Sequence, residues 1–158
     1  MAKENDELLY VEQPALDQLQ SNGWSYKDGK ELVPETSDIR SSLQKVTLNL
    51  NLEQAIQRIN PWISEENLRK IVRDVTEIQT TTLMEANQWL WERLTQYFSV
   101  EQDLGSGRRG QTVKLIDFEN IQNNEFLCVN QFKIKGLTQN IIPDIILFVN
   151  GLPLGVIE

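Results

Sequence analysis

The chain has 158 residues, 40% of them hydrophobic and 24% charged, with a formal net charge of −8 at pH 7. This is the size and composition of roughly one globular domain with a buried core. The sequence has no histidine and one cysteine, Cys128, which excludes histidine-dependent catalysis, histidine-ligated zinc and an internal disulfide. The acidic balance argues against tight autonomous binding to nucleic acid, but it does not exclude DNA delivered by partners. We expect a cytoplasmic protein, because the lone cysteine fits a reducing compartment and no apolar stretch could span a membrane.

Helical periodicity dominates the first two thirds of the sequence. Apolar residues recur at helical spacing in four segments, each with a capping residue or proline near its start. A strand is predicted at 46–52, where leucine and valine alternate with polar residues. Loops are predicted at 27–34 and in the glycine-rich, basic stretch 104–110. The predicted helices are 13–21, 52–59, 64–75 and 82–98.

After this stretch the apolar residues follow the period of strands. Segments rich in β-branched and aromatic residues alternate with turn residues. The segment 144–149 is apolar on both faces after its first residue, which predicts a central strand. We therefore predict an α+β fold in a single domain, with a helical part at about 8–98 and a mainly antiparallel or mixed sheet at about 112–158. The predicted strands are 112–118, 126–133, 144–149 and 154–158.

Two acids, Asp144 and Glu158, flank two apolar strands joined by an Asn-Gly turn at 150–151. A strict two-residue turn would pair Asp144 with Ile157 and point Glu158 to the opposite face. Pro153 disfavours that arrangement, so we predict an odd-length loop or a bulge that sets the two acids opposite each other. Two such carboxylates could share one Mg²⁺. From the spacing alone, the favoured interpretation is that Asp144 caps the start of a strand and that Glu158 is a solvated residue.

Five segments carry a more specific signal through their order and spacing: VKLIDF at 113–118, NNEF at 123–126, VNQF at 129–132, PDIILFVNGLPL at 143–154 and VIE at 156–158. They resemble the N-terminal nuclease domain of the restriction subunit of type I restriction-modification enzymes. Short stretches at 11–16, 23–26 and 59–61 are similar too, so the likeness covers most of the chain. This domain belongs to the PD-(D/E)xK nucleases, and the resemblance implies a restriction-endonuclease-like fold.

The resemblance also implies roles for the two acids. Asp144 would be the aspartate of Pro-Asp and Glu158 the glutamate of Glu-x-Lys, and together they would hold Mg²⁺ for DNA hydrolysis. The group often adds an acid from a helix before the sheet, for which Glu85 and Glu92 are candidates, although a solvated surface position is the simpler reading. The family pattern places a lysine two positions after Glu158, where this sequence has ended, so we expect these 158 residues alone to be inactive or weak. Ile142 stands where the family often has a basic residue.

Basic residues outside the acid pair are candidates for contact with a DNA backbone. Lys133 and Lys135 share one strand face, although a solvated edge that resists aggregation is the simpler reading. Gln131 could reach a phosphate or a metal-bound water. The candidate DNA contacts are Lys133, Lys135, Arg108, Arg109 and Gln131.

As a whole, the resemblance implies an endodeoxyribonuclease that cleaves double-stranded DNA with Mg²⁺ while an ATP-driven motor moves the duplex. ATP would bind only domains absent from this sequence. The partners would be methyltransferase and specificity subunits, with no membrane association. The alternative is a non-catalytic docking or DNA-contact module that keeps the nuclease fold, and metal binding at Asp144 distinguishes the two. A third reading is an unrelated α+β binding domain.

Overall fold

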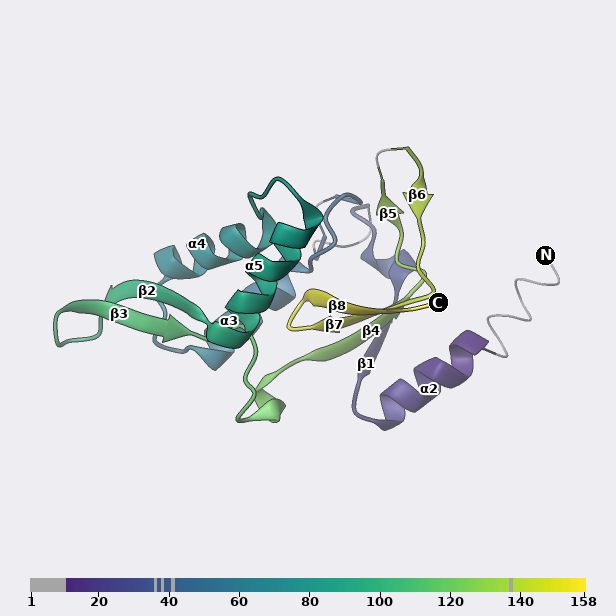
Figure 1. Ribbon diagram of the computed structural model, residues 1–158. Coiled ribbons are helices and arrows are strands. Elements are labelled where there is room, and N and C mark those ends of the chain that lie inside the picture. The colour runs from purple at the N-terminus through teal and green to yellow at the C-terminus, as the bar shows by residue number, and fades with distance from the viewer. Residues whose placement is uncertain (1–10, 36, 38, 41, 137) are drawn as a thin grey trace. The chain divides into compact units, whose positions relative to one another are not determined.

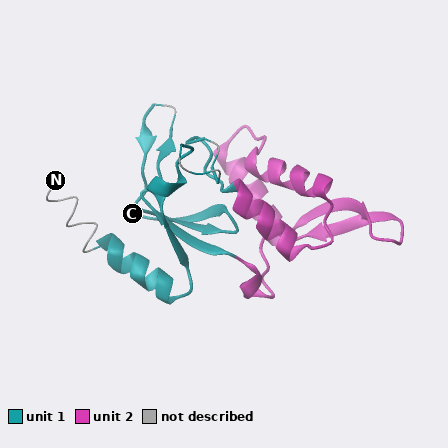
Figure 2. Ribbon diagram, turned by 180° about the vertical axis from the view of Figure 1, so that it is seen from behind, with its two compact units in different colours: residues 1–48, 125–158 teal, residues 49–124 magenta. Residues whose placement is uncertain are grey.

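The computed structural model describes residues 11–35, 37, 39–40, 42–136 and 138–158. The chain forms two compact units (Figure 2). One unit combines residues 1–48 with residues 125–158, and the other consists of residues 49–124. The described residues before 49 therefore fold together with residues 125–158. Part of the predicted helical region, residues 8–10, lies outside the described residues.

The first unit contains a four-stranded sheet in the order β1–β4–β7–β8 (Figure 1). β1 runs parallel to β4, whereas the β4–β7 and β7–β8 pairs are antiparallel. β7 has a neighbour on each side, which confirms the predicted central strand. The α+β fold class with a mixed sheet is also confirmed. The strands are β1 (Ser25–Asp28), β4 (Phe126–Asn130), β7 (Ile145–Val149) and β8 (Leu152–Ile157).

Different segments cover the two faces of this sheet. α2 (Gln13–Ser21) has a proline in its first turn and packs Leu16 against Cys128 and Ile145. Because side chains alternate along a strand, β4 and β7 also supply residues to a second cluster on the opposite face. A separate hairpin of two short strands, β5 (Ile134–Lys135) and β6 (Asn140–Ile141), completes the unit. The second cluster consists of Leu32, Leu48, Leu127, Val129, Phe132, Ile146 and Phe148.

A buried arginine holds together the chain beside this second cluster. The Arg40 side chain donates hydrogen bonds to the carbonyl oxygens of Leu43, Lys45 and Lys133 at 2.6, 2.6 and 2.7 Å. Its guanidinium carbon lies 4.0 Å from the centre of the Phe132 ring. Arg40 is only 1% exposed, and this burial lowers its pKa. The carbonyls and the ring therefore compensate a charge that has been removed from water.

The second unit contains three helices and a hairpin. The Ser64 and Thr82 side chains cap two of the helices by accepting hydrogen bonds from backbone N–H groups three residues later. The helices predicted at 13–21, 52–59, 64–75 and 82–98 are confirmed, with small differences at their ends. A short helix that the sequence also suggests near 39–43 is absent from the described residues of that stretch. No helix in the described part of the chain is long and apolar enough to cross a bilayer. The elements are α3 (Asn49–Ile59), α4 (Glu65–Thr76), α5 (Leu83–Gln96), β2 (Phe98–Asp103), β3 (Arg108–Val113) and η3 (Ile121–Asn123).

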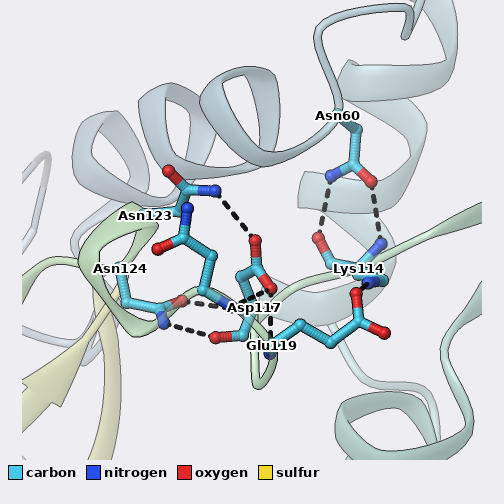
Figure 3. Close-up of polar contacts among 7 residues, drawn as sticks. Asn60, Lys114, Asp117, Glu119, Asn123 and Asn124 are labelled. Carbon is cyan, nitrogen blue, oxygen red and sulfur yellow. Dashed lines mark hydrogen bonds and ion pairs between the residues drawn. The ribbon is translucent and has the colours of Figure 1, made fainter.

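Side-chain hydrogen bonds replace strand pairing after β3 (Figure 3). The buried Asn60 amide donates to the carbonyl oxygens of Ile56 and Lys114 at 2.9 and 2.8 Å, and its oxygen accepts from the Lys114 N–H at 2.9 Å. Asn60 thus links the end of α3 to the chain beyond β3. The Lys114 ammonium pairs with Glu119 at 2.7 Å, which raises the pKa of Lys114.

A turn built around Asp117 follows. Its carboxylate accepts hydrogen bonds from the Asn120 N–H at 3.0 Å, the Asn123 side chain at 2.8 Å and the Glu119 N–H at 3.1 Å (Figure 3). These bonds, above all those from Asn120 and Asn123, lower the pKa of Asp117. The Asn124 side chain accepts from the Asp117 N–H and donates to the Asp117 carbonyl. The turn therefore satisfies backbone groups that would otherwise need a neighbouring strand.

Several local predictions are wrong. Residues 49–52 belong to α3 rather than to the strand predicted at 46–52, because Leu52, Ala55 and Ile56 are buried at helical spacing. The strand predicted at 112–118 ends at Val113, where the Asn60 side chain takes over the hydrogen bonding. The strands predicted at 126–133 and 154–158 are confirmed with shifted ends.

Two predicted loops contain strands. The stretch 104–110 is a turn at 104–107 between paired strands, since β3 begins at Arg108. The stretch 27–34 begins inside β1, whose partner β4 lies about a hundred residues later. A local pattern of apolar residues cannot reveal such a distant partner.

Candidate active site

The β7–β8 hairpin has the bulge that the acid spacing predicts. Val149 pairs with Leu152 across a two-residue turn, and the register then shifts so that Leu147 pairs with Gly155. Asn150 and Gly151 have φ values of 53° and 79°, as a tight hairpin turn requires. The hairpin thus combines a tight turn with an extra residue in β8.

Two other segments hold this turn in place. The buried Asn150 side chain accepts a hydrogen bond from the Glu125 N–H at 2.8 Å, and the Asn150 backbone N–H donates to the Glu125 carbonyl at 2.9 Å. The Gly151 carbonyl accepts from the Leu48 N–H at 2.9 Å. Because these bonds fix the turn, they also fix which residues face each other at the far end of the hairpin.

At that far end, Ile145 pairs with Ile157. Extending this register by one residue sets Asp144 opposite Glu158, where Cβ atoms of paired residues are about 4.5 to 5.5 Å apart. Asp144 is half-buried and Glu158 is exposed. Within the described part of the chain, neither carboxylate makes a hydrogen bond or an ion pair. Both are therefore available to an external ligand.

The structure adds a carboxylate that sequence reasoning missed. Glu12 directly precedes α2 and is 7% exposed. The Gln131 side-chain amide lies 3.3 and 3.4 Å from the two oxygens of the Glu12 carboxylate. The Gln131 N–H donates to the Asp144 carbonyl at 3.1 Å. Glu12 is thus connected to Asp144 through one residue, and its place in the similar segment 11–16 was the signal for it.

The ligand chemistry of the acid pair fits a hard divalent cation. Asp144 and Glu158 offer carboxylate oxygens, which Mg²⁺ prefers, and such ions usually keep several waters. In the regions that the structure describes, no three histidine, cysteine, aspartate or glutamate side chains are arranged to hold a metal. The acid pair would therefore need water or substrate oxygens to complete the coordination.

Comparison with known proteins identifies the family. Residues 6–158 match the family model described as type I restriction enzyme R protein N terminus. The chain belongs to this family. The type I restriction enzyme HindI endonuclease subunit of Haemophilus influenzae is 38% identical over 160 residues, covering 100% of this chain and 15% of the relative. A protein of Methanocaldococcus jannaschii, named as the MjaIXP endonuclease subunit of such an enzyme, is 36% identical over 160 residues, covering 99% of this chain and 15% of the relative.

The chain thus spans about 15% of the length of these curated relatives. Membership of the restriction enzyme R protein family confirms the resemblance stated from the sequence. Family membership also excludes the third hypothesis, that the chain is an unrelated α+β binding domain.

The two helix acids of this R protein domain have other partners. The Glu85 carboxylate accepts hydrogen bonds from the Thr81 hydroxyl at 2.7 Å and from the N–H groups of Thr81 and Thr82 at 3.2 Å. Those from Thr81 contribute most to lowering the pKa of Glu85. Glu92 accepts from the Gln88 side chain at 3.0 Å. Both acids lie in the 49–124 unit, whereas the acid pair lies in the other unit. Their role as an additional acid stays a prediction.

The candidate DNA contacts of the R protein domain are also divided between the units. Lys133 and Lys135 lie at the start of the β5–β6 hairpin, where Lys133 is half-buried and Lys135 exposed. Arg108 and Arg109 are exposed on β3, and Arg108 approaches Glu101 to 3.8 Å. Contact between DNA and any of these residues, or Gln131, stays a prediction.

Proposed function

We propose that this chain is the nuclease domain of a type I restriction enzyme and that Asp144 and Glu158 bind the Mg²⁺ needed to cleave DNA. The observation that carries this proposal is the shifted β7–β8 register, which extends to place Asp144 opposite Glu158. The family and the names of the relatives, which are endonuclease subunits, support it. A bulge of this kind re-aims side chains at functional sites.

The residues of the site have separate tasks in this proposal. Asp144 and Glu158 supply hard oxygen ligands, and water or substrate oxygens complete the coordination. When bound, Mg²⁺ stabilises charge on the scissile phosphate and lowers the pKa of a water ligand. The motif lysine, which would help to orient or deprotonate that water, is not within residues 1–158, so we expect weak cleavage by these residues alone.

The remaining length of the relatives provides room for further functions. We propose that the complete subunit also carries an ATP-driven motor and assembles in the cytoplasm with methyltransferase and specificity subunits. Double-stranded DNA is then the substrate. Because the chain has a net charge of −8, the other parts of the complex would supply much of the DNA affinity.

A non-catalytic docking module is the second candidate. The observation that favours it is the lack, across the described residues, of three acids arranged to hold a metal. Such a module would keep the fold and the exposed basic hairpins but would not bind Mg²⁺ or Mn²⁺.

Metal binding by the 158-residue chain separates the two candidates. We expect calorimetry or Mn²⁺ electron paramagnetic resonance to detect one Mn²⁺ per chain. The affinity should fall at least about tenfold in Asp144→Ala and Glu158→Gln, the scale seen when residues that support a metal site are lost. Glu35→Gln, an exposed acid in the same unit, is the matched control and should bind normally. Equal binding by all four proteins would contradict the site.

Cleavage is tested in a subunit extended past Glu158 to include the motif lysine and assembled with its partner subunits. With Mg²⁺ and ATP, Asp144→Ala should lower the DNA cleavage rate at least about 100-fold, as does removal of one charge-stabilising group elsewhere. ATP hydrolysis by the same complex should be unchanged, which shows that the complex has assembled. Undiminished cleavage by the variant would leave the docking module as the better account.

A further inference from the structure

The outer edge of β2 has no strand beside it. Among the described residues β2 pairs only with β3, and α4 lies along its other edge (Figure 1). The Asn67 side chain of α4 donates to the Glu101 carbonyl oxygen at 3.4 Å, so this carbonyl points away from β3. Both backbone groups of a residue in an antiparallel strand point to the same side, and the side alternates along the strand. Ser99 and Glu101 therefore direct their N–H and C=O groups toward α4.

Most of these backbone groups are unpaired. Within the part of the chain that the structure describes, the Ser99 N–H and C=O groups, the Ser99 hydroxyl and the Glu101 N–H make no hydrogen bond. β2 has six residues, which is a full strand length. An exposed strand edge of this length is a template for another extended chain, and proteins usually shorten or cover it.

A groove lies between this edge and α4. Its volume is about 860 Å³, which is within the range of ligand sites. Ser99, Val100 and Glu101 form one wall, and Lys70 and Arg73 of α4 form part of the other. Every residue that lines the groove belongs to the 49–124 unit, so the groove is separate from the acid pair of the other unit.

The groove is basic, although the chain as a whole is acidic. It is lined by four basic and three acidic side chains, in a chain with a net charge of −8. Two of the acids are already paired, since Glu65 contacts Arg69 and Glu101 approaches Arg108 to 3.8 Å. The third acid, Glu66, lies in the first turn of α4. Anionic groups are therefore attracted to the part of the groove beyond that turn.

Two cations in that part are available to a ligand. Lys70 makes no hydrogen bond or ion pair with any described residue, and the Arg73 side chain only approaches its neighbour Asp74, at 3.7 Å. Both side chains are exposed, and residues three positions apart lie on the same face of a helix. A ligand in the groove would thus meet two positive charges on one side and unpaired backbone groups on the other.

We propose that this groove binds an extended acidic segment of a partner protein, which adds to β2 as a third strand. The backbone of the segment would pair with Ser99 and Glu101, and its acidic side chains would contact Lys70 and Arg73. In such strand addition the main-chain hydrogen bonds provide affinity and the side chains provide specificity. This role goes beyond the proposed function and does not depend on metal binding or cleavage.

The strand edge favours a peptide over a nucleic acid. An extended peptide repeats its N–H and C=O groups at the spacing of β2. A phosphate backbone has no N–H donor for the Ser99 carbonyl, and its continuous negative charge would also meet Glu66 and Glu101. A nucleic acid would thus use the two cations and leave the strand edge unpaired.

The test follows the backbone amide signals of the isotope-labelled 158-residue chain by NMR during titration. The probes are blocked peptides of about six residues, an ordinary strand length, in which glutamate or lysine alternates with valine. We expect the glutamate peptide to shift the Ser99 and Glu101 signals and the lysine peptide to leave them unchanged. Methylating all backbone nitrogens of the glutamate peptide should weaken its binding at least about tenfold, which corresponds to the loss of two hydrogen bonds.

Substitutions locate the bound peptide. Lys70→Gln and Arg73→Gln should each weaken the glutamate peptide about two- to fivefold, as the loss of an exposed ion pair does. Arg109→Gln is the matched control and should bind normally. Arg109 is exposed on β3 next to Arg108, and adjacent residues of a strand point to opposite faces.

Distinct results would overturn each part of the inference. The absence of a shift at Ser99 and Glu101 with millimolar glutamate peptide would exclude the site. Equal binding by the methylated peptide would exclude strand addition, and an equal loss in Arg109→Gln would indicate unspecific attraction between opposite charges. Larger shifts of the same two signals by single-stranded DNA than by the glutamate peptide would assign the groove to nucleic acid instead.

Discussion

Replacing Gly29 with alanine should destabilise the first unit and disturb the candidate site together. The added Cβ would meet the Asn130 oxygen at 2.5 Å, the Gln131 oxygen at 2.6 Å and the Gln131 carbonyl carbon at 2.7 Å. Ordinary contacts between heavy atoms are about 3.5 Å or longer, so backbone must move by nearly 1 Å. No side-chain rotation can relieve this clash, because all three atoms belong to the main chain.

Overpacking of this kind costs about 1 to 3 kcal/mol. For a chain of this size, each kcal/mol lowers the melting temperature by about 2 to 4 °C, so we expect a fall of about 2 to 12 °C by calorimetry or circular dichroism. Mn²⁺ affinity should fall as well, because the shift moves Gln131. Gly110→Ala is the matched control, since its added Cβ meets only the Ser99 hydroxyl oxygen, at 3.3 Å. A loss of less than about 1 °C in Gly29→Ala, or one no larger than in the control, would refute the close approach.

Three further predictions concern stability. Asn60→Ala should cost about 2 to 4 kcal/mol in chemical denaturation, because it removes the three hydrogen bonds of a buried side chain; a loss below about 1 kcal/mol would contradict them. Arg40→Met should cost a similar amount, about 2 to 4 kcal/mol, by removing three hydrogen bonds to backbone carbonyl oxygens, whereas exposed Arg69→Met should be nearly neutral. Since folding lowers the pKa of Asp117, its carboxylate stabilises the fold above its ordinary pKa of about 3.9 and loses this effect as the pH falls through the folded value. The melting-temperature deficit of Asp117→Asn should therefore shrink between pH 7 and pH 3, and a constant deficit would show that the charge is irrelevant.

Local patterns predicted much of this fold. The four helices follow from apolar spacing and turn or capping residues within short segments. α5 begins where predicted, at Thr82, and the structure adds a capping box between Thr82 and Glu85. The β7–β8 hairpin and its bulge follow from the Asn-Gly turn and the spacing of two acids. In each case the information lies within about 15 neighbouring residues, where local backbone preference and side-chain periodicity act directly.

Local patterns could not predict the pairing of strands that lie far apart in the sequence. β1 joins the sheet through β4, and the Cys128 thiol contacts the Ser25 carbonyl across 103 positions. Glu12 joins the candidate site through Gln131 for the same reason, since only the folded topology brings them together. The strand predicted at 46–52 failed because both helix and strand periods fit its leucines, and burial along α3 favoured the helix. β3 ends at Val113, earlier than predicted, because the Asn60 side chain forms hydrogen bonds with Lys114 in place of a neighbouring strand.

The Asn-Gly turn at 150–151 sets the register of the two acids. The residues on either side of 49–124, Leu48 and Glu125, both form hydrogen bonds with this turn. Leu48, where the chain leaves the first unit, donates to Gly151, and Glu125, where it returns, donates to the Asn150 side chain. The second unit is therefore an insertion whose two attachment points are neighbours on one hairpin. A short linker from residue 48 to residue 125 would close the first unit into a miniature domain that still contains Glu12, Gln131, Asp144 and Glu158. Such a chain would need to close a far shorter loop to pair β1 with β4, and loop-closure entropy favours that pairing.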